Sequence, residues 1–195
     1  MLKKFTEKMI ILLTKTRNWW YKSYVNRFGD IEEKEGKAMY TIFDIANWFL
    51  QKESMNHRKL QKLCYYAQAW HLAMYNKTPL FNGTFEAWVH GPVNRKLWND
   101  LKEYGYVDVP QDHFSDIDSS ELLKDSDTDQ FLEGVWNTYG GFNGYQLERL
   151  THNEAPWLIA RGDAPEQAPS NKIISNIDMY NYYNQAQLRG DGIGE

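Results

Sequence analysis

The clearest hydrophobic period in the chain lies between residues 56 and 77. Apolar positions recur every three or four residues and form one continuous helical face: Leu60, Leu63, Cys64, Ala67, Trp70, His71 and Met74. The opposite side carries polar and basic residues, among them Gln61, Lys62 and Gln68. The basic residues at its start, Arg58, Lys59 and Lys62, are expected to form a solvated face or a docking face for an acidic partner. Asn76 and Pro79 end the pattern. The spacing predicts a helix of about five turns that packs against other helices.

Further helices are predicted on both sides of this one. Thr41 followed by Asp44 is close to a capping box and begins an amphipathic helix. Spacing from residue 93 to 101 predicts another helix, closed by Gly105. Later helical patterns cover residues 130–141, 144–151 and 154–161, and a last helix begins after residue 175. Two polar residues are expected as caps of the last two helices: Asn153 and Ser175.

Only one stretch resembles a strand. "TFEAWVH" alternates in polarity and lies between two turn signals, Asn82-Gly83 and Gly91-Pro92. The predicted fold is therefore mainly α, a compact single domain of about six helices with at most a short strand or hairpin. Residues 39–188 form this domain, residues 1–38 an N-terminal basic extension and residues 189–195 a disordered tail.

Charge is distributed unevenly. Residues 1–28 contain seven basic residues and one acid, a net charge of +6, so the remainder must carry −10 for the whole chain to reach −4. A domain of that charge is not expected to bind nucleic acid, and it suits a basic protein partner. The segment 110–129 holds seven acids and one lysine and is expected to be a solvated, loosely held loop.

Residues 1–38 admit three interpretations. They could form a basic amphipathic helix on an anionic membrane, the less favoured interpretation, or a segment that folds on a partner. Alternatively, "KEGKAM" at residues 34–39 can be encoded with a purine-rich ribosome-binding sequence just before the codon of Met39. In that case translation begins at Met39 and the upstream residues come from an over-extended gene assignment.

The sequence offers few candidates for catalytic chemistry. The sequence contains no phosphate loop, Rossmann glycine pattern or nucleophile elbow. The single cysteine, Cys64, lies mid-helix on the apolar face and excludes a disulfide framework, which favours a cytoplasmic protein. A metal or acid–base enzyme would have to use His71, His90 and His152, with Glu86, although their spacing matches no metal motif. No cofactor is expected.

Two ordered motifs carry a family resemblance. "KLQKLCYYAQAWHLAMYNKTPLFNGTFEAWVHGPV" is followed some sixty residues later by "LTHNEAPW". Together they resemble the Panacea domain, the SocA-like antitoxin family, over nearly all of residues 39–183. The resemblance implies a mostly helical protein that neutralises an adjacently encoded toxin, such as a translation inhibitor or an alarmone synthetase, by direct contact. One branch of the family instead delivers its toxin to a protease as an adaptor. No catalytic residues travel with the family.

The sequence therefore predicts an antitoxin, not an enzyme, and leaves the identity of the toxin, the binding face and the oligomeric state open. A surplus of aromatic residues, 15% of the chain, agrees with a protein-binding role. The candidate partner-binding residues are Arg58, Lys59, Lys62, Tyr66, Trp88, His90 and Arg95. The residues expected to have structural roles are Trp70, His71, Gly91, Pro92, His152, Pro156 and Trp157. In "EAWVHGPV", Gly91-Pro92 is expected to turn the chain into the next helix, with Trp88 buried in the corner and His90 bonded to the turn.

Overall fold

A computed structural model describes residues 40–119, 122 and 124–191. Within this part of the chain there are seven α-helices, rather than about six, and five short strands. The helices are α2 (Ile42–Leu50), α3 (His57–Met74), α4 (Arg95–Leu101), α6 (Ser126–Tyr139), α7 (Gly144–Thr151), α8 (Ala155–Arg161) and α9 (Asn176–Asp191), with a 3₁₀ helix, η1 (Lys102–Tyr104). The mainly α prediction is confirmed. The extension at residues 1–38 lies outside the described residues.

The strands form two small antiparallel sheets. Strand β1 (Met55–Asn56) pairs with β4 (Asp108–Val109), and β2 (Phe85–Trp88) lies between β3 (Gly91–Val93) and β5 (Ile173–Ile174). The predicted strand in "TFEAWVH" is therefore confirmed as β2, but the sheet content exceeds the single hairpin that was expected. Helix α9 follows β5 directly and continues to Asp191, into the segment expected to be a disordered tail.

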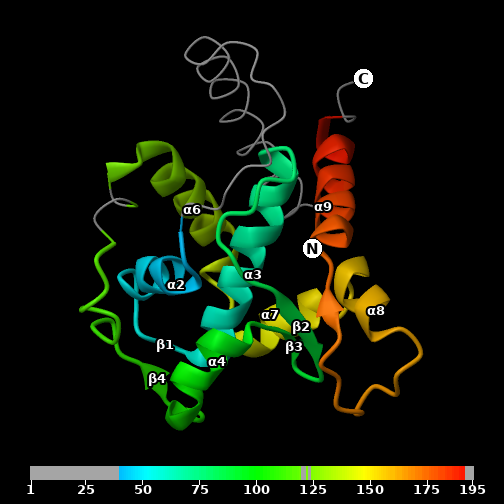
Figure 1. Ribbon diagram of the computed structural model, residues 1–195, viewed down its shortest axis with the longest axis horizontal. Helices are drawn as coiled ribbons and strands as arrows, with labels where there is room; N and C mark the ends of the chain where they lie inside the picture. Colours follow the sequence, from blue (N-terminus) through cyan, green and yellow to red (C-terminus); the bar gives the residue numbers. More distant parts are fainter. Residues whose placement is uncertain (1–39, 120–121, 123, 192–195) are drawn as a thin grey trace.

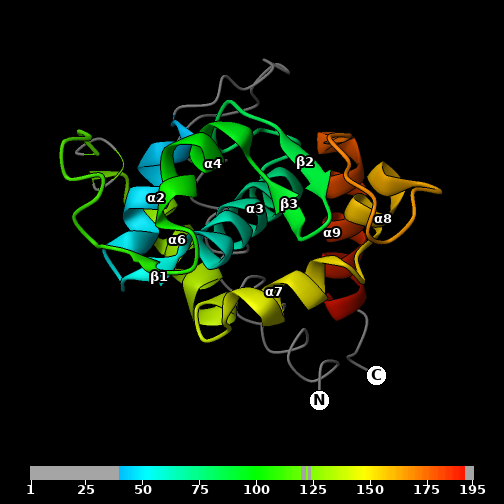
Figure 2. The ribbon, with the colours of Figure 1, turned by 90° about the horizontal axis from the view of Figure 1, so that it is seen from below.

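Helix α3 is the centre of the domain (Figure 1). It contacts α2, α6, α7 and α9, as well as α4 and β3, and Figure 2 shows these elements arranged around it. Consequently the helix is buried on nearly all sides, including the side predicted to be solvated. That prediction is wrong for Lys59 and Lys62, which are 8% and 1% exposed. Gln61 and Gln68, on the same side, are 1% and 0% exposed.

The two glutamines of α3 bind backbone groups of neighbouring segments. Gln68 donates to the carbonyl of Phe81 and accepts from the amides of Leu80 (3.0 Å) and Phe81 (3.2 Å). Gln61 makes the same kind of paired contact with the amide (2.8 Å) and carbonyl (3.1 Å) of Asn94. A buried amide side chain is stable when its donor and acceptor are both satisfied, so these residues fix loops against the helix without exposing it.

The predicted helix ends agree with the structure in part. Thr41 and Asp44 form a capping box at α2, and the hydroxyl of Ser175 accepts from the amide of Ile177 before α9. Pro156 lies in the first turn of α8, as expected, but the N-cap of that helix is Glu154 rather than Asn153. The error is one residue, within the usual variation of helix ends.

The acidic segment is more ordered than predicted. Phe114 and Leu122 are buried in the core, and Asp125 caps the start of α6. Asp125 also accepts a hydrogen bond from Tyr40 at 2.8 Å, while Asp129 accepts one from the indole of Trp48 at 2.7 Å. The expectation of a loosely held loop is therefore wrong for these residues, because several of the acids bind the core instead of facing water.

Candidate functional site

The segment "EAWVHGPV" forms a tight hairpin beside α3. Strands β2 and β3 pair from Glu86↔Val93 to Trp88↔Gly91, so the chain reverses at residues 89 and 90. Pro92 lies within β3, an edge strand, where its missing amide hydrogen costs no sheet pairing. The prediction that Gly91-Pro92 turns into the next helix is therefore wrong. Asn94 separates the two elements and caps α4 instead.

Gly91 is required at its position for two reasons. Its φ of +89° lies in the region that favours glycine. A Cβ atom there would also lie 2.6 Å from Cε of Lys62 and 2.9 Å from the hydroxyl of Thr151. The hairpin thus rests directly on helices α3 and α7.

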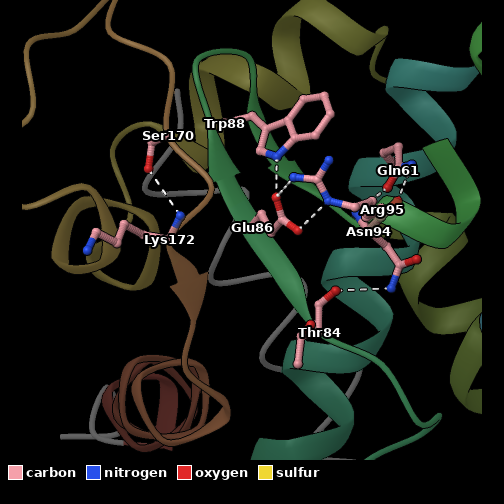
Figure 3. Close-up of polar contacts among 8 residues, drawn as sticks. All are labelled: Gln61, Thr84, Glu86, Trp88, Asn94, Arg95, Ser170 and Lys172. Carbon is pink, nitrogen blue, oxygen red and sulfur yellow. Dashed lines mark hydrogen bonds and ion pairs between the residues drawn. The ribbon is translucent and has the colours of Figure 1, made fainter. Parts of the chain in front are cut away.

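The side chains of Glu86, Trp88 and Arg95 form one cluster between the hairpin and α4 (Figure 3). Glu86 and Trp88 are two residues apart on a strand and share a face. The buried carboxylate of Glu86 accepts from the indole of Trp88 (2.8 Å) and from Nε (2.8 Å) and Nη2 of Arg95. The guanidinium also lies 5.2 Å from the centre of the Trp88 ring. The bonds from Arg95 and then from Trp88 hold the pKa of Glu86 below its usual value, despite the opposing effect of burial.

A pocket of about 280 Å³ opens between the hairpin and the start of α3. We call it the hairpin pocket. Its walls include the rings of Trp88, Trp98 and Tyr106, and Tyr106 is 88% exposed at its mouth. The remaining lining residues are His57, Arg58, Gln61, Lys62, His90, Val93 and Gly105. The pocket therefore has aromatic walls and a basic inner end.

Glu148 of α7 connects the hairpin to the start of α3. One carboxylate oxygen lies 3.1 Å from Nδ1 of His90, and the other lies 3.8 Å from the guanidinium of Arg58. Hence His90 bonds to a neighbouring helix and not, as expected, to the backbone of its own turn. This contact ties the exposed tip of the hairpin to α7.

The second motif, "LTHNEAPW", packs against the same hairpin. Trp157 is 5% exposed and donates its indole hydrogen to the carbonyl of Trp88 at 3.1 Å. His152 stacks on the Trp157 ring with centroids 4.0 Å apart. Burial, foremost, lowers the pKa of His152. The two sequence motifs therefore meet in space, with Trp157 buried as predicted.

The candidate partner-binding residues separate into two groups. Arg58, Trp88 and His90 line the hairpin pocket near the surface, and Arg95 lies beside it, whereas Lys62 is at its buried end. The other two are in the interior. Lys59 binds Glu53 and the carbonyl of Gly140, and Tyr66 stacks on Tyr139 at 3.8 Å. Lys59 and Tyr66, named as candidates for partner binding, are 8% and 0% exposed, because α3 is enclosed by other helices.

The structure does not assemble the three histidines proposed for an enzyme. Nδ1 of His71 donates to the carbonyl of Thr78 (2.8 Å), and the ring stacks on Tyr75 near the end of α3. His71 lies nine residues after Lys62 on α3, about 14 Å along the helix axis. It is therefore distant from His90 and His152. Burial lowers the pKa of His71 to about 4. Trp70 is also a core residue, bonded to the hydroxyl of Tyr139. Among the described residues, no group of three His, Cys, Asp or Glu residues could hold a metal ion.

Several residues of the site were not predicted. Trp98, Tyr106 and Glu148 lie outside the motifs that define the hairpin and the long helix, and His57 precedes Leu60, the first apolar position of the period. A single aromatic residue in a loop, such as Tyr106, gives no periodic signal. Glu148 could have been recognised as a candidate only because it is a charged residue on the buried face of an amphipathic helix.

Comparison with known proteins supports the resemblance seen in the motifs. The model of the family "Antitoxin SocA-like, Panacea domain" matches residues 60–158, just over half of the chain. The chain belongs to this family. A curated relative, Antitoxin SocA of Caulobacter vibrioides (strain NA1000 / CB15N), is 27% identical over 167 residues, which covers 77% of this chain and 88% of the relative. No solved structure matches.

The matched region of this SocA-like chain contains both motifs, except for Lys59 at the start of the first, and most of the hairpin pocket, from Gln61 to Tyr106. It also contains Glu148 and Trp157, which join the second motif to the first. None of the helices in the described part of the chain is long and apolar enough to cross a membrane.

Proposed function

We propose that this protein is the antitoxin of a toxin–antitoxin pair and neutralises an adjacently encoded toxin by direct protein–protein binding in the cytoplasm. The family membership and the relationship to Antitoxin SocA support this role, and no enzymatic step is proposed. The proposed binding face surrounds the mouth of the hairpin pocket.

The observation that carries this choice of face is the fixed aromatic and cationic cluster. Trp88 is held by Glu86 and Arg95 on one side and contacts Trp98 on the other, at 5.1 Å between centroids. Tyr, Trp and Arg are the residues most often found at binding hot spots. Because their positions are fixed before binding, little side-chain entropy is lost on association.

Exposed apolar residues extend the same face. Tyr106 and Val107 (64% exposed) follow η1 at the mouth of the pocket. Tyr145, 65% exposed, is next to Gly144, which packs against Arg58 at the start of α3. Exposed tyrosines around a concave site are typical of protein interfaces.

The first test is to express the neighbouring open reading frame alone and together with this protein, and to measure growth. We expect the neighbour to arrest growth and co-expression to restore it through a complex that can be isolated. If the toxin protein disappears during rescue in a protease-dependent way, the adaptor function would replace simple neutralisation. A harmless neighbour, or failed rescue with both proteins present, would contradict the proposal.

The second test addresses the face. Tyr106→Ala removes a ring that is almost fully exposed, so we expect normal folding and at least about tenfold weaker toxin binding. Ile159→Ala on α8, where Ile159 is 59% exposed, is the matched control. Loss of binding in the Ile159 variant with full binding in the Tyr106 variant would place the interface elsewhere.

A further inference from the structure

The inner end of the hairpin pocket contains a buried lysine without a protein counter-ion. Lys62 is 1% exposed and lines the pocket. Among the described residues its ammonium group forms no hydrogen bond and no ion pair within 4 Å. A buried charge is normally paired, because transfer of an unpaired ion from water into the protein interior is strongly unfavourable.

The titratable groups around Lys62 do not supply the missing partner. They belong to α3, α7 and the hairpin: His57, Arg58, His90, Glu148 and His152. Glu148 is the acid among them, but its oxygens face His90 and Arg58, and it does not line the pocket. Burial, only partly offset by Glu148, lowers the pKa of Lys62 to about 7. An anion placed in the pocket would restore its charge.

A second polar group at this end also lacks a partner. Nδ1 of His57 is buried and forms no hydrogen bond in the part of the chain that the structure describes. Burial, and then the charges of Arg58 and Lys62, lower the pKa of His57, against the opposing effect of a hydrogen bond with the backbone of Gly105. A carboxylate beside Nδ1 would favour the protonated ring, in which both nitrogens donate. A buried, unbonded polar atom beside an unpaired lysine indicates a site for an acceptor.

The charge balance and the walls define the ligand class. Arg58 and protonated Lys62 carry +2, and Glu148 carries −1, so the site has a net charge of about +1. This matches a monoanion better than a dianionic phosphate. The rings of Trp88, Trp98 and Tyr106 suit an apolar body behind the charged group.

We propose that the hairpin pocket binds a carboxylate on a short apolar stem, with Lys62 as its counter-ion and Arg58 and His57 as further partners. The carboxylate would come either from an acidic side chain of a bound protein or from a small free carboxylic acid. The proposal does not depend on the proposed function, since binding can be measured on this chain alone.

The test uses the full chain and butyrate as the probe, followed by two-dimensional ¹⁵N–¹H NMR at constant ionic strength. We expect the amides of Gly91 and Gly105 and the indole of Trp88 to shift with a dissociation constant on the order of 1 mM. Butyramide, which has the same shape without the charge, and inorganic phosphate should bind at least about tenfold more weakly.

Lys62→Met should abolish butyrate binding while retaining the fold, since a buried charge is replaced by an apolar side chain. Lys96→Met, at an exposed position of α4, is the matched control and should bind like the natural protein. Butyrate affinity should fall at least about tenfold from pH 6 to pH 8.5, because Lys62 loses its proton. Equal binding of butyramide, or undiminished binding by the Lys62 variant, would overturn the proposal.

A second arm identifies the source of the carboxylate. If an acidic side chain of the toxin occupies the pocket, butyrate should dissociate the isolated complex and Lys62→Met should weaken it. If the complex still binds butyrate without dissociating, a small free acid is the natural occupant. A negative growth assay with positive butyrate binding would leave this inference standing while rejecting the proposed function.

Discussion

Gly91 and Lys62 are in direct contact: a methyl group on Gly91 would lie 2.6 Å from Cε of the lysine. The hairpin turn therefore packs against the end of the buried side chain of Lys62. A side chain on Gly91 would force the end of Lys62 to move.

Gly91→Ala should destabilise the protein by about 2–4 kcal/mol, because the substitution combines a positive φ with a clash against Lys62 and Thr151. Urea denaturation measures the change. Gly162→Ala is the control, since Gly162 has a φ of +55° and its Cβ would meet nothing within 4 Å. It should cost only about 1 kcal/mol. Equal losses in the two variants would show that the contact with Lys62 is not tight.

Lys62→Met should change how stability depends on pH. The folded pKa of about 7 lies below the unfolded value of 10.5, so the unfolded state binds more protons between these values. The natural protein should therefore gain stability as pH rises from 7 to 9, by about 2 kcal/mol from this residue. The variant should lack that gain, and its advantage over the natural protein should shrink over the same range. Parallel pH profiles from denaturant titrations would contradict the burial of an unpaired ammonium.

Glu154→Gln should remove a pH dependence of the opposite sign. The carboxylate of Glu154 accepts from the buried hydroxyls of Tyr66 (3.1 Å) and Tyr183 (2.7 Å), and burial raises its pKa to about 7. Because the folded state holds the proton more tightly than the unfolded state, stability should fall from about pH 4.5 to pH 7 by about 2–3 kcal/mol. Thermal unfolding at pH 5 and pH 8 should show a smaller decrease in the variant.

The control for this prediction is Glu166→Gln, at an exposed position in the link after α8. It should keep the decrease of the natural protein. If Glu154→Gln keeps it too, another group is responsible for the pH dependence.

Gln68→Met should cost about 2–4 kcal/mol, because the buried amides of Leu80 and Phe81 lose their acceptor while the volume of the side chain is retained. Gln51→Met is the comparison, since Gln51 is exposed and its amide bonds only to Asn47 and Gln111. That variant should change stability by less than about 0.5 kcal/mol. Chemical denaturation of both variants would settle whether Gln68 fixes the loop, and a small loss at Gln68 would contradict it.

Local signals predicted the elements well. The capping box at Thr41, the period of α3, the alternation in β2 and the proline of α8 each depend on neighbours within one or two turns. These interactions are readable from the sequence because propensity and periodicity act over that range.

Burial around α3 could not be predicted in the same way. Hydrophobic periodicity indicates one buried face of a helix, whereas α3 is surrounded by other elements. Gln61 and Gln68 remain buried because each binds backbone on another segment, a contact that depends on the tertiary fold. The Gly-Pro signal does not show that Gly91 packs against Lys62, twenty-nine positions earlier in the chain, because that contact too depends on the tertiary fold.

The pairing of β2 with β5 joins Phe85 to Ile174 and Glu86 to Ile173. During translation, the hairpin therefore emerges long before the strand that completes its sheet. A chain released from the ribosome before residue 174 would contain both family motifs and the whole lining of the hairpin pocket. However, β2 would lack its pairing with β5, and α3 would lack its contacts with α9. Domains generally fold as complete units during synthesis. The fold thus makes a finished binding face conditional on nearly full-length synthesis, so incomplete chains produced under translational stress would not acquire it.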